Sequence, residues 1–403
     1  MTSIEEFRAE AKAFLDANAE PRREVTLTWG EGSDEVALFP EMTPEEEATH
    51  VKAAKEWRGK LYDAGFGWIS GPPEYGGRGL PREYERAWQS LESGYETPPQ
   101  GPFGIGLGMI APTIQAHATD VVKQRYLPAM YRGDVIACQL FSEPVAGSDL
   151  AGIQTRAVRD GDEWVLNGQK VWTSGAQYSD IGEIITRTST DPDSRHRGLT
   201  MFVVDMHAPG VEVRPLRQMT GGASFNEVFF TDVRVPAEFL LGDADQGWTV
   251  ALTTLMNERM AIGGGSIAPG QGVSQRLGLL ARHFDRAGDP HVRQALADIY
   301  INSSVARFTT MRAVAKLRAG QLPGPEASTL KLSLTNNLQR VSTAVSTILG
   351  PSLIADTGEW GTYAWADLVL GVPGLRVAGG TDEVMRNIVG ERVLGLPKEP
   401  RGS

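Results

Sequence analysis

Two polar corners within residues 138–175 carry the residue types best suited to chemistry in this chain. The first, Ser142–Asp149 (SEPVAGSD), combines one Pro, one Gly and several small hydroxyl or carboxylate side chains. The second, Val171–Gly175 (VWTSG), offers an indole face followed by two hydroxyls. Such groups suit a flat ring that has heteroatoms along its edge and phosphates attached. Taken singly, each corner has a plainer explanation, because Gly turns and packed Trp side chains are common in β domains.

The segment between these corners is predicted to be a β-hairpin. Apolar and polar residues alternate in part up to a turn at Asp160-Gly161, and the alternation resumes as far as Asn167-Gly168. Short antiparallel strands would therefore tie the two corners together.

A third candidate lies near the end of the sequence, at Ala378–Ile388 (AGGTDEVMRNI). Two glycines and a Thr precede a predicted helix that has acids in its first turn. Such a helix start exposes N–H donors and the positive end of the helix dipole. A plain Gly-Thr cap is the commoner meaning of this kind of string.

The elements around these motifs fall into three blocks. Residues 134 to about 242 shift toward a period of two, with turns every 8–12 residues or so, which predicts a small β-barrel or sandwich. The flanking blocks have helical periodicity, with a Thr43-Pro44 helix start in the first and long helices with short links in the last. The predicted helices cover residues 3–19, 43–64, 81–93, 105–118, 120–133, 247–263, 270–283, 288–319, 325–349 and 382–394.

This pattern predicts an α+β multidomain fold. An N-terminal α-helical domain (1–133) precedes a middle β domain (134–242) and a C-terminal helical bundle (243–403). A length of 403 residues agrees with two or three domains.

Composition excludes several classes of protein. The net charge of -11 argues against nucleic acid and anionic membrane surfaces. A single cysteine, Cys138, excludes an intramolecular disulfide, and neither it nor the six His show metal-ligand spacing. The acid-rich N-terminus lacks the apolar core of a signal peptide, and no run approaches the roughly 18 apolar residues of a membrane span. We therefore expect a cytoplasmic enzyme without a metal.

Together the motifs resemble those of the acyl-CoA dehydrogenases, which are FAD flavoproteins. SEPVAGSD is similar to the family's TEPGAGSD loop and VWTSG to its WITNG segment. The ending GGTDEVMRNIVGERVLGLP is similar to GGTSE(I/V)xRNIIAxRVLGLP, and PEYGGRGL and HATDVVKQRYLPAMYRGD match N-terminal landmarks. The resemblance covers nearly the whole chain. It implies a helical domain, a β domain and a C-terminal four-helix bundle.

The resemblance also implies a reaction. Family members oxidise acyl-CoA thioesters to 2,3-enoyl-CoA: a carboxylate removes the α-proton while hydride leaves the β-carbon for flavin N5. The carboxylate needs a dry site that raises its pKa, and the thioester carbonyl needs donors for its developing charge.

The base of many members is a Glu just before the Gly-Thr pair, and here that position is Gly379. Another branch, which acts on branched, long-chain and steroid-derived acyl groups, has its base on a C-terminal-domain helix just before an Arg. That position here is Glu258, among Leu255, Met256 and Met260. An apolar setting of this kind raises a carboxylate pKa. A structural salt bridge to a neighbouring Arg is the alternative, and Asp382 and Glu383 are the fallback bases.

Further site residues follow from the same resemblance. The expected flavin contacts are Phe141, Ser142, Ser148, Trp172, Thr173, Ser174, Thr381, Asp382 and Glu383. The expected substrate contacts are Ser148, Arg259 and Gly380. An electron-transferring flavoprotein is the expected acceptor.

Two departures from the family pattern keep other assemblies open. Many members carry Arg-x-x-Phe-Gly and Gln-x-x-Gly-Gly segments that serve the adenosine and pyrophosphate end of FAD. The corresponding regions here read LLARHFDRAG and TILGP. A homodimer or homotetramer is expected, with a heterotetramer as the alternative. The chain could then be a complementary, non-catalytic subunit, and other flavin chemistry, such as oxygenation, is a third possibility.

Overall fold

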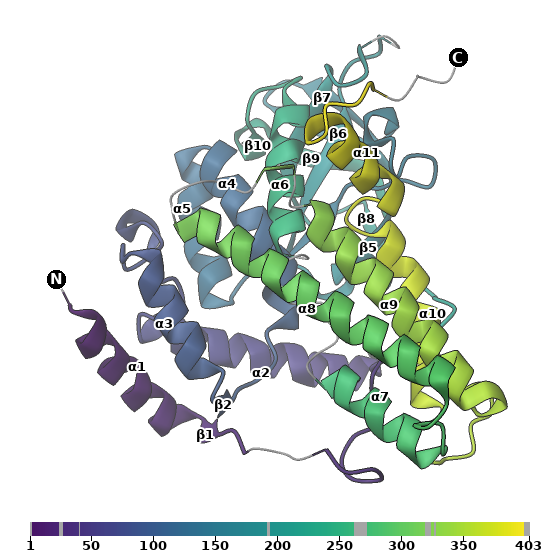
Figure 1. Cartoon of the computed structure of the whole chain (residues 1–403). Coiled ribbons are helices and arrows are strands. Elements are labelled where there is room, and N and C mark those ends of the chain that lie inside the picture. Colours follow the sequence, from purple (N-terminus) through teal and green to yellow (C-terminus); the bar gives the residue numbers. More distant parts are fainter. Residues whose placement is uncertain are drawn as a thin grey trace. The chain divides into compact units, whose positions relative to one another are not determined.

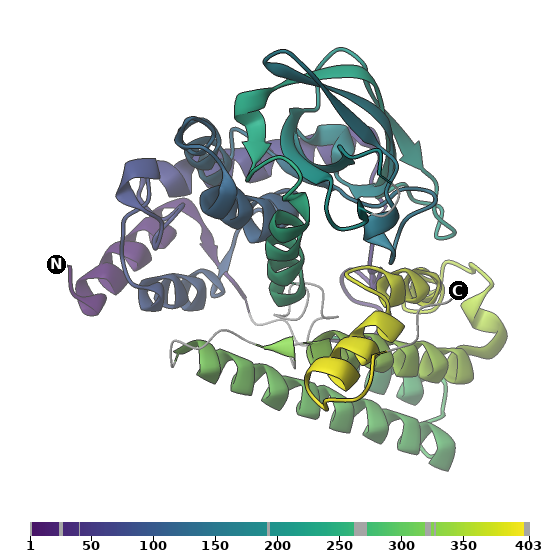
Figure 2. The ribbon, with the colours of Figure 1, turned by 90° about the horizontal axis from the view of Figure 1, so that it is seen from above.

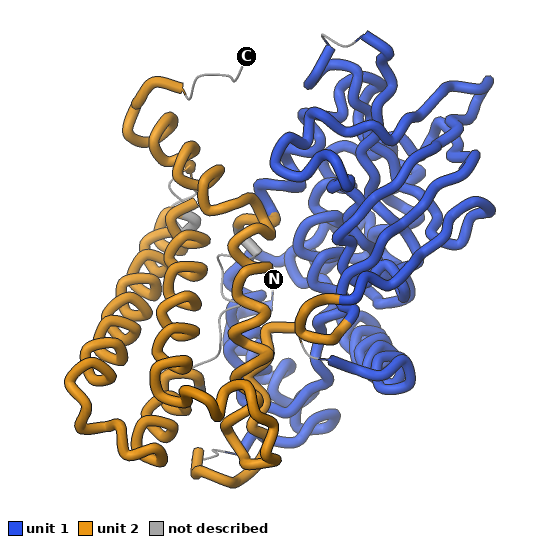
Figure 3. The backbone as a smooth tube through the Cα atoms, turned by 90° about the vertical axis from the view of Figure 1, so that its right-hand side faces the viewer, with its two compact units in different colours: residues 1–24, 41–217, 223–257 blue, residues 25–40, 218–222, 258–403 orange. Residues whose placement is uncertain are grey.

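The structure is a computed structural model, shown with its element labels in Figure 1. It describes residues 2–23, 27–39, 41–191, 194–261, 272–318, 324–325 and 328–398. The chain divides into two compact units, coloured separately in Figure 3. Unit 1 holds residues 1–24, 41–217 and 223–257, and unit 2 holds residues 25–40, 218–222 and 258–403. Each unit is described below by itself.

The N-terminal part of unit 1 is helical, as predicted. Two of its helices begin with reciprocal capping boxes, Ser3 with Glu6 and Thr43 with Glu46, which satisfy free N–H groups at each helix start. The predicted helix over 105–118 differs in detail, because a π-helical stretch at Gly106–Ile110 precedes its α-helical part. The helices are α1 (Ile4–Asn18), α2 (Pro44–Asp63), α3 (Arg82–Glu92), α4 (Ala111–His117) and α5 (Asp120–Arg132).

The rest of unit 1 contains an eight-stranded sheet in the order β10-β7-β6-β4-β5-β9-β8, with β3 paired to β6. Figure 2 shows how strongly the sheet curls. Its strands are β3 (Ala137–Leu140), β4 (Arg156–Asp160), β5 (Glu163–Ser174), β6 (Ile181–Arg187), β7 (Leu199–Asp205), β8 (Val211–Leu216), β9 (Phe225–Pro236) and β10 (Leu240–Leu241). A two-stranded ladder, β1 (Glu20–Pro21) with β2 (Tyr95–Glu96), lies among the helices. The predicted middle β domain is confirmed.

The predicted hairpin is present as β4 and β5. Its strands pair in antiparallel register from Asp160↔Glu163 to Arg156↔Asn167. Strand β5 continues beyond the predicted alternation to Ser174 and pairs with β9 on its other side. The β5–β9 register shifts between Lys170 and Thr173, so the strand is irregular where it reaches Trp172.

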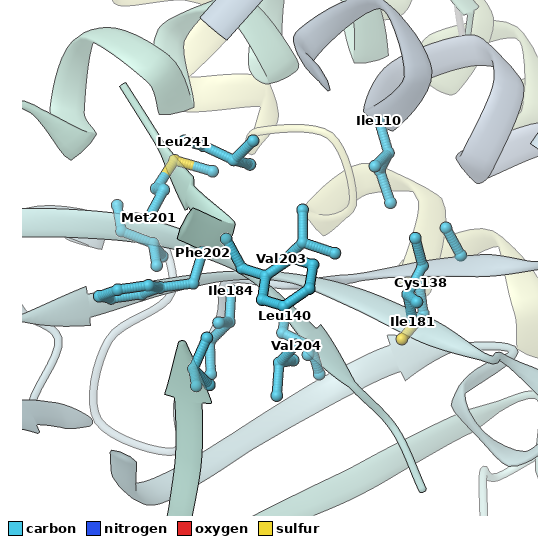
Figure 4. Close-up of a cluster of buried hydrophobic side chains, with 14 of the residues drawn as sticks. Ile110, Cys138, Leu140, Ile181, Ile184, Met201, Phe202, Val203, Val204 and Leu241 are labelled. Carbon is cyan, nitrogen blue, oxygen red and sulfur yellow. The ribbon is translucent and has the colours of Figure 1, made fainter. Parts of the chain in front are cut away.

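One apolar core joins the sheet to the helices beside it. Figure 4 shows part of it, with Leu140, Ile184, Phe202 and Val204 from the strands and Ile110 from the π-helical stretch. Val250 and Ala251, at the start of α6 (Gly247–Ala261), belong to the same buried cluster. The first part of α6 is therefore anchored to the core of unit 1.

Unit 2 is helical and centres on α9, which contacts the other helices of the bundle. Its helices are α7 (Gly272–His283), α8 (Pro290–Arg318), α9 (Ser328–Leu349), α10 (Ala364–Val377) and α11 (Asp382–Arg392). Four of them match predicted helices, and the predicted C-terminal bundle is confirmed. The predicted positions 262–263, 270–271, 319 and 326–327 lie outside the described residues.

Helix α10 is missing from the sequence-based prediction, which was wrong there. Its sequence, AWADLVLGVPGLRV, contains Gly371, Pro373 and Gly374, residues that usually end or weaken a helix. The helix persists because Trp365, Leu368, Val372 and Leu375 are buried in the core of unit 2, so packing outweighs propensity.

Within the described residues, no helix is both long enough and apolar enough to cross a membrane. The boundaries at residues 133 and 242 between the three predicted domains remain predictions.

Candidate functional site

The first polar corner is a compact turn at the end of β3. Glu143 and Ala146 exchange backbone hydrogen bonds of 2.9 and 3.1 Å across it. Phe141 is buried, Ser142 is half-buried, and Ser148 is exposed. The loop therefore presents polar groups on a rigid base.

The second corner presents an aromatic face in a strained backbone. Trp172 has φ 62°, a left-handed conformation that a bulky residue rarely adopts. Its side chain is 58% exposed, with an edge-on contact to Phe225 at a ring-centroid distance of 6.0 Å. The strand thus holds a large apolar ring at the surface, where a flat ligand could pack on it.

Thr173 beside it is buried, yet its hydroxyl has no hydrogen-bond partner among the described residues. The carbonyl of Thr173 accepts a 3.1 Å hydrogen bond from the Asn226 side-chain amide, which also donates to Gln177 at 2.6 Å. A buried hydroxyl without a partner is costly unless a ligand or water satisfies it. The hydroxyl and the exposed indole plane are the groups that a flavin ring, with heteroatoms along its edge, would use.

The two corners are tied together by direct hydrogen bonds. The Val171 N–H donates to the Ser142 carbonyl at 2.9 Å. The Lys170 ammonium donates to the Phe141 carbonyl at 3.0 Å and to the Glu143 carboxylate at 2.8 Å. The structure therefore brings Phe141, Ser142, Trp172, Thr173 and Ser174 together in one unit.

Lys170 and Glu143 form a buried ion pair behind this site. Burial lowers the pKa of the Lys170 ammonium to about 8, although Glu143 opposes that change. Burial also acts to raise the pKa of Glu143, but Lys170 and hydrogen bonds from Gln154 and Thr155 outweigh it, so this pKa lies below its ordinary value. Glu143 therefore remains charged in the folded protein at neutral pH.

The third motif lies in unit 2, at the start of α11. Thr381 caps the helix by accepting from the Val384 N–H at 3.2 Å. Gly379 and Gly380 before it have φ 66° and 89°, and a Cβ on Gly380 would lie 2.6 Å from the Met385 methyl carbon. This turn requires glycine at position 380.

Asp382 is buried behind this turn. Its carboxylate accepts from the Thr335 hydroxyl at 2.8 Å, the Arg376 guanidinium at 2.9 Å and the Lys331 ammonium at 3.1 Å. Burial acts to raise its pKa, but these three donors outweigh that effect and the pKa is lowered. A carboxylate with a lowered pKa is a poor proton acceptor, which disfavours Asp382 as the fallback base. Glu383 is exposed and pairs with Arg386 at 3.3 Å.

Glu258 lies in the last turn of α6 and is half-buried. Burial lowers the pKa of the neighbouring Arg259, and the Glu258 carboxylate acts in the opposite direction. One turn earlier on the same helix face, the buried Thr254 hydroxyl donates to the Glu183 carboxylate at 2.9 Å. This buried bond fixes the rotation of α6 on unit 1.

The predicted site residues are thus divided between the units. The flavin contacts predicted in unit 1 lie on two segments that hydrogen bonds tie together, and Ser148 among them is exposed. The predicted residues of unit 2 lie at the end of α6, at positions 258 and 259, and in the turn and first residues of α11, at positions 380 to 383. That the two sets contact the same cofactor and substrate remains a prediction.

Sequence reasoning missed the residues that hold these turns in place. Lys170, Asn226 and Lys331 are all buried, and each donates to a backbone carbonyl within a motif or at most two residues from it. One signal was available for Lys170: it follows Gly168 in a strand that is otherwise mostly apolar at its inward positions.

Comparison with known proteins assigns the chain to a family. Models of the N-terminal, middle and C-terminal acyl-CoA dehydrogenase domains match residues 2–134, 138–233 and 245–394. The chain belongs to the acyl-CoA dehydrogenase family. It is accordingly an oxidoreductase whose cofactor is FAD, and the exposed Trp172 and the unpartnered Thr173 hydroxyl fit that cofactor.

Two relatives are from Mycobacterium tuberculosis. The acyl-CoA dehydrogenase IpdE1 is 34% identical over 410 residues, covering all of both chains. FadE34 is 38% identical over 290 residues, which cover 72% of this dehydrogenase but only 39% of FadE34.

Solved structures show the same fold. A steroid acyl-CoA dehydrogenase, Tcur3481-Tcur3483, matches with a TM-score of 0.74 at 27% identity, covering 98% of each chain. The ChsE4-ChsE5 complex from Mycobacterium tuberculosis matches with a TM-score of 0.71 at 26% identity, covering 99% of each chain.

Proposed function

We propose that this dehydrogenase oxidises a branched or ring-bearing acyl-CoA to its 2,3-enoyl-CoA, with Glu258 as the base. One observation carries the assignment of the base. The position before Gly380-Thr381, where many relatives have their catalytic Glu, is Gly379, in a left-handed conformation. The sequence has no Glu at this position, and a Glu placed there would have a strained backbone. The proton acceptor must therefore come from another element.

Glu258 would take the α-proton of the thioester. Its half-buried position on α6 limits the contact of the carboxylate with water, and a general base needs such a shielded place beside the proton it removes. Arg259 would hold the substrate beside it. In the turn before α11, the N–H of Gly379 would donate to the thioester oxygen, where negative charge develops as the α-proton leaves, and Gly380 would lie by the substrate.

The FAD-binding residues are proposed from the geometry of unit 1 and the family resemblance. Trp172 would pack on the isoalloxazine ring, and the Thr173 hydroxyl and Ser174 would meet the ring edge. Phe141, Ser142 and Ser148 would line the ring from the first corner. Thr381, Asp382 and Glu383, which belong to unit 2, would lie beside the cofactor. When bound, FAD accepts at N5 the hydride that leaves the β-carbon. Because Asp382 already accepts from three protein donors, its contribution is the position of the turn.

The substrate class rests on the relatives and on the position of the base. Relatives are named cyclohexane-1-carbonyl-CoA dehydrogenase, from Geobacter metallireducens and Syntrophus aciditrophicus, and (2S)-methylsuccinyl-CoA dehydrogenase, from Cereibacter sphaeroides. Their names describe ring-bearing or branched acyl groups, as does that of the steroid dehydrogenase. These names support a bulky acyl group over a straight chain.

The proposed assembly pairs this chain with a second chain of the same family. The ChsE4-ChsE5 complex supports this, because a chain that matches this one is found there in a complex of two differently named proteins. Native mass spectrometry of the protein purified from its source would test the pairing: a heteromer with bound FAD is expected, and a homomer with full FAD content would contradict it. The proposed electron acceptor is an electron-transferring flavoprotein.

The reaction is tested by anaerobic mixing of the purified flavoprotein with a panel of acyl-CoAs. Straight-chain, methyl-branched, cyclohexyl and steroid-derived thioesters would be compared. We expect the flavin band near 450 nm to bleach fastest with a branched or ring-bearing member, and the product to be lighter by two hydrogens. Bleaching without loss of two hydrogens would contradict the proposed reaction. Fastest bleaching with a straight chain would contradict the substrate class.

A further inference from the structure

Lys170 and Glu143 form an ion pair that is almost wholly removed from solvent. The side-chain exposures are 0% for Lys170 and 3% for Glu143, and the nitrogen–oxygen distance is 2.8 Å. The carboxylate also accepts from the Gln154 N–H at 2.6 Å and the Thr155 N–H at 2.9 Å. Both of its oxygens are therefore engaged by the protein, and Glu143 does not need a ligand to satisfy it.

The pair joins three separate segments behind the flavin-binding corners. Lys170 donates to the Phe141 carbonyl, one residue before Ser142, and it lies two residues before Trp172 on β5. Glu143 follows Ser142 directly and fixes the chain at 154–155. The backbone on both sides of Ser142 is thus held against the strand that carries Trp172.

A buried ion pair could either stabilise the fold or fix the geometry of the groups around it. A buried ion pair contributes little net stability compared with apolar side chains, because desolvation offsets the attraction between the charges. It does impose geometry, because each charged group needs its partners at defined distances and angles. A pair behind the irregular part of β5 would set the spacing between the two corners.

We propose that Lys170 and Glu143 are positioning residues for FAD. Through the bonds of Lys170 to the Phe141 carbonyl and to the Glu143 carboxylate they hold the Ser142–Asp149 loop at the distance from Trp172 and Thr173 that the isoalloxazine ring requires, without touching the ring. The inference rests on the proposed flavin contacts of unit 1 and does not depend on the base or on the acyl group.

The test compares Lys170→Met, Glu143→Gln and the double variant with the wild type. Each single variant leaves one buried charge without its partner, so the melting temperature falls. The double variant has no buried charge, and the amide oxygen introduced by Glu143→Gln can still accept from one of the two N–H groups at 154 and 155, so part of the lost melting temperature returns. We expect its FAD dissociation constant to stay raised on the order of tenfold, as when outer-shell partners of a bound group are lost. The flavin absorption band should also be shifted.

Glu163→Gln is the matched control. Glu163 is on the same strand and forms an exposed ion pair with Arg234 at 2.9 Å, so FAD affinity and spectrum should be unchanged. If the double variant binds FAD with wild-type affinity and spectrum, the pair is only structural and the proposal fails. If either single variant does not fold, the FAD affinity and spectrum of the double variant still test the proposal. Both measurements need no acyl-CoA, so they stand even if the proposed dehydrogenation is wrong.

Discussion

The Val171 N–H donates to the Ser142 carbonyl at 2.9 Å, which joins two motifs that lie almost 30 residues apart in the chain. This bond lies between the buried Lys170 and the exposed Trp172. Lys170, on one side of it, holds the backbone at Phe141, and the Trp172 side chain, on the other side, is exposed. The proposed flavin site of unit 1 thus has a rigid base and an open aromatic face.

The indole of Trp172 is expected to contribute to FAD binding, while the positive φ of this residue lowers the stability of the apoprotein. Trp172→Gly relieves the strain of the positive φ but adds freedom to the unfolded chain, so the free energy of unfolding of the apoprotein should rise by at most about 1 kcal/mol. FAD affinity should fall sharply, because the ring's packing surface is lost. Trp172→Ala, which keeps the strain, should lose FAD affinity and be less stable than the Gly variant. Denaturant unfolding and FAD titration measure both effects. An apoprotein destabilised by more than about 2 kcal/mol in the Gly variant would show that the indole is a structural side chain.

The Thr173 hydroxyl should matter for catalysis and not for stability. Thr173→Val removes a buried hydroxyl that has no protein partner among the described residues, so the free energy of unfolding should be unchanged or higher by about 1 kcal/mol. The rate of flavin reduction should fall, by about 100-fold if the hydroxyl stabilises developing charge. Thr186→Val is the control, since that hydroxyl donates to the Thr200 carbonyl at 3.0 Å and its loss should cost about 1 kcal/mol. Equal destabilisation of the two variants would contradict this prediction.

Two buried carboxylates should make the protein sensitive to acid. The pKa values of Glu143 and Asp382 are lowered in the folded state. Their stabilisation is therefore present above the unfolded pKa, about 4, and is lost as pH falls through the folded values. Urea unfolding between pH 7 and pH 3 should show a steep loss below about pH 4. Asp382→Asn and Glu143→Gln should be less stable at neutral pH and lose less on acidification. If the unfolding free energy of both variants fell with pH as steeply as that of the wild type, the acid sensitivity would not come from these two carboxylates.

The turn before α11 should tolerate only glycine at position 380. Gly380→Ala places a Cβ at φ 89° and 2.6 Å from the Met385 methyl carbon, so we expect a loss of about 1–3 kcal/mol in unfolding free energy. Gly390→Ala is the control within α11. Its Cβ would meet Leu396 at 3.7 Å, an ordinary contact, and alanine favours a helix by up to about 1 kcal/mol. Equal effects at the two positions would show that the turn is not strained.

Periodicity and caps predicted most of the fold. The Thr43-Pro44 helix start, the hairpin around Gly161 and the return of helical spacing after Trp248 are all local signals, and each is confirmed. Helix α10 was missed because its stability comes from burial of Trp365 and its neighbours, which local sequence cannot show.

The motif residues of the site could be predicted from the sequence, but the buried residues that hold the motifs in place could not. Lys170 and Lys331 look like ordinary surface lysines in a sequence, since their partners Glu143 and Asp382 are 27 and 51 positions away. Only the folded register places each lysine against a motif carboxylate. The positive φ of Trp172 likewise depends on the shift in pairing between β5 and β9.

The most direct test of Glu258 as the base is the rate at which an acyl-CoA reduces the flavin of Glu258→Gln. Rapid mixing without oxygen would use the best thioester of the panel, with Asp298→Asn, an exposed carboxylate paired with Arg340 on the bundle, as the control. We expect Glu258→Gln to keep its FAD and its affinity for the thioester while flavin reduction falls by about 100-fold or more. Wild-type reduction by Glu258→Gln would contradict this assignment and return the search for the base to the remaining carboxylates of the site.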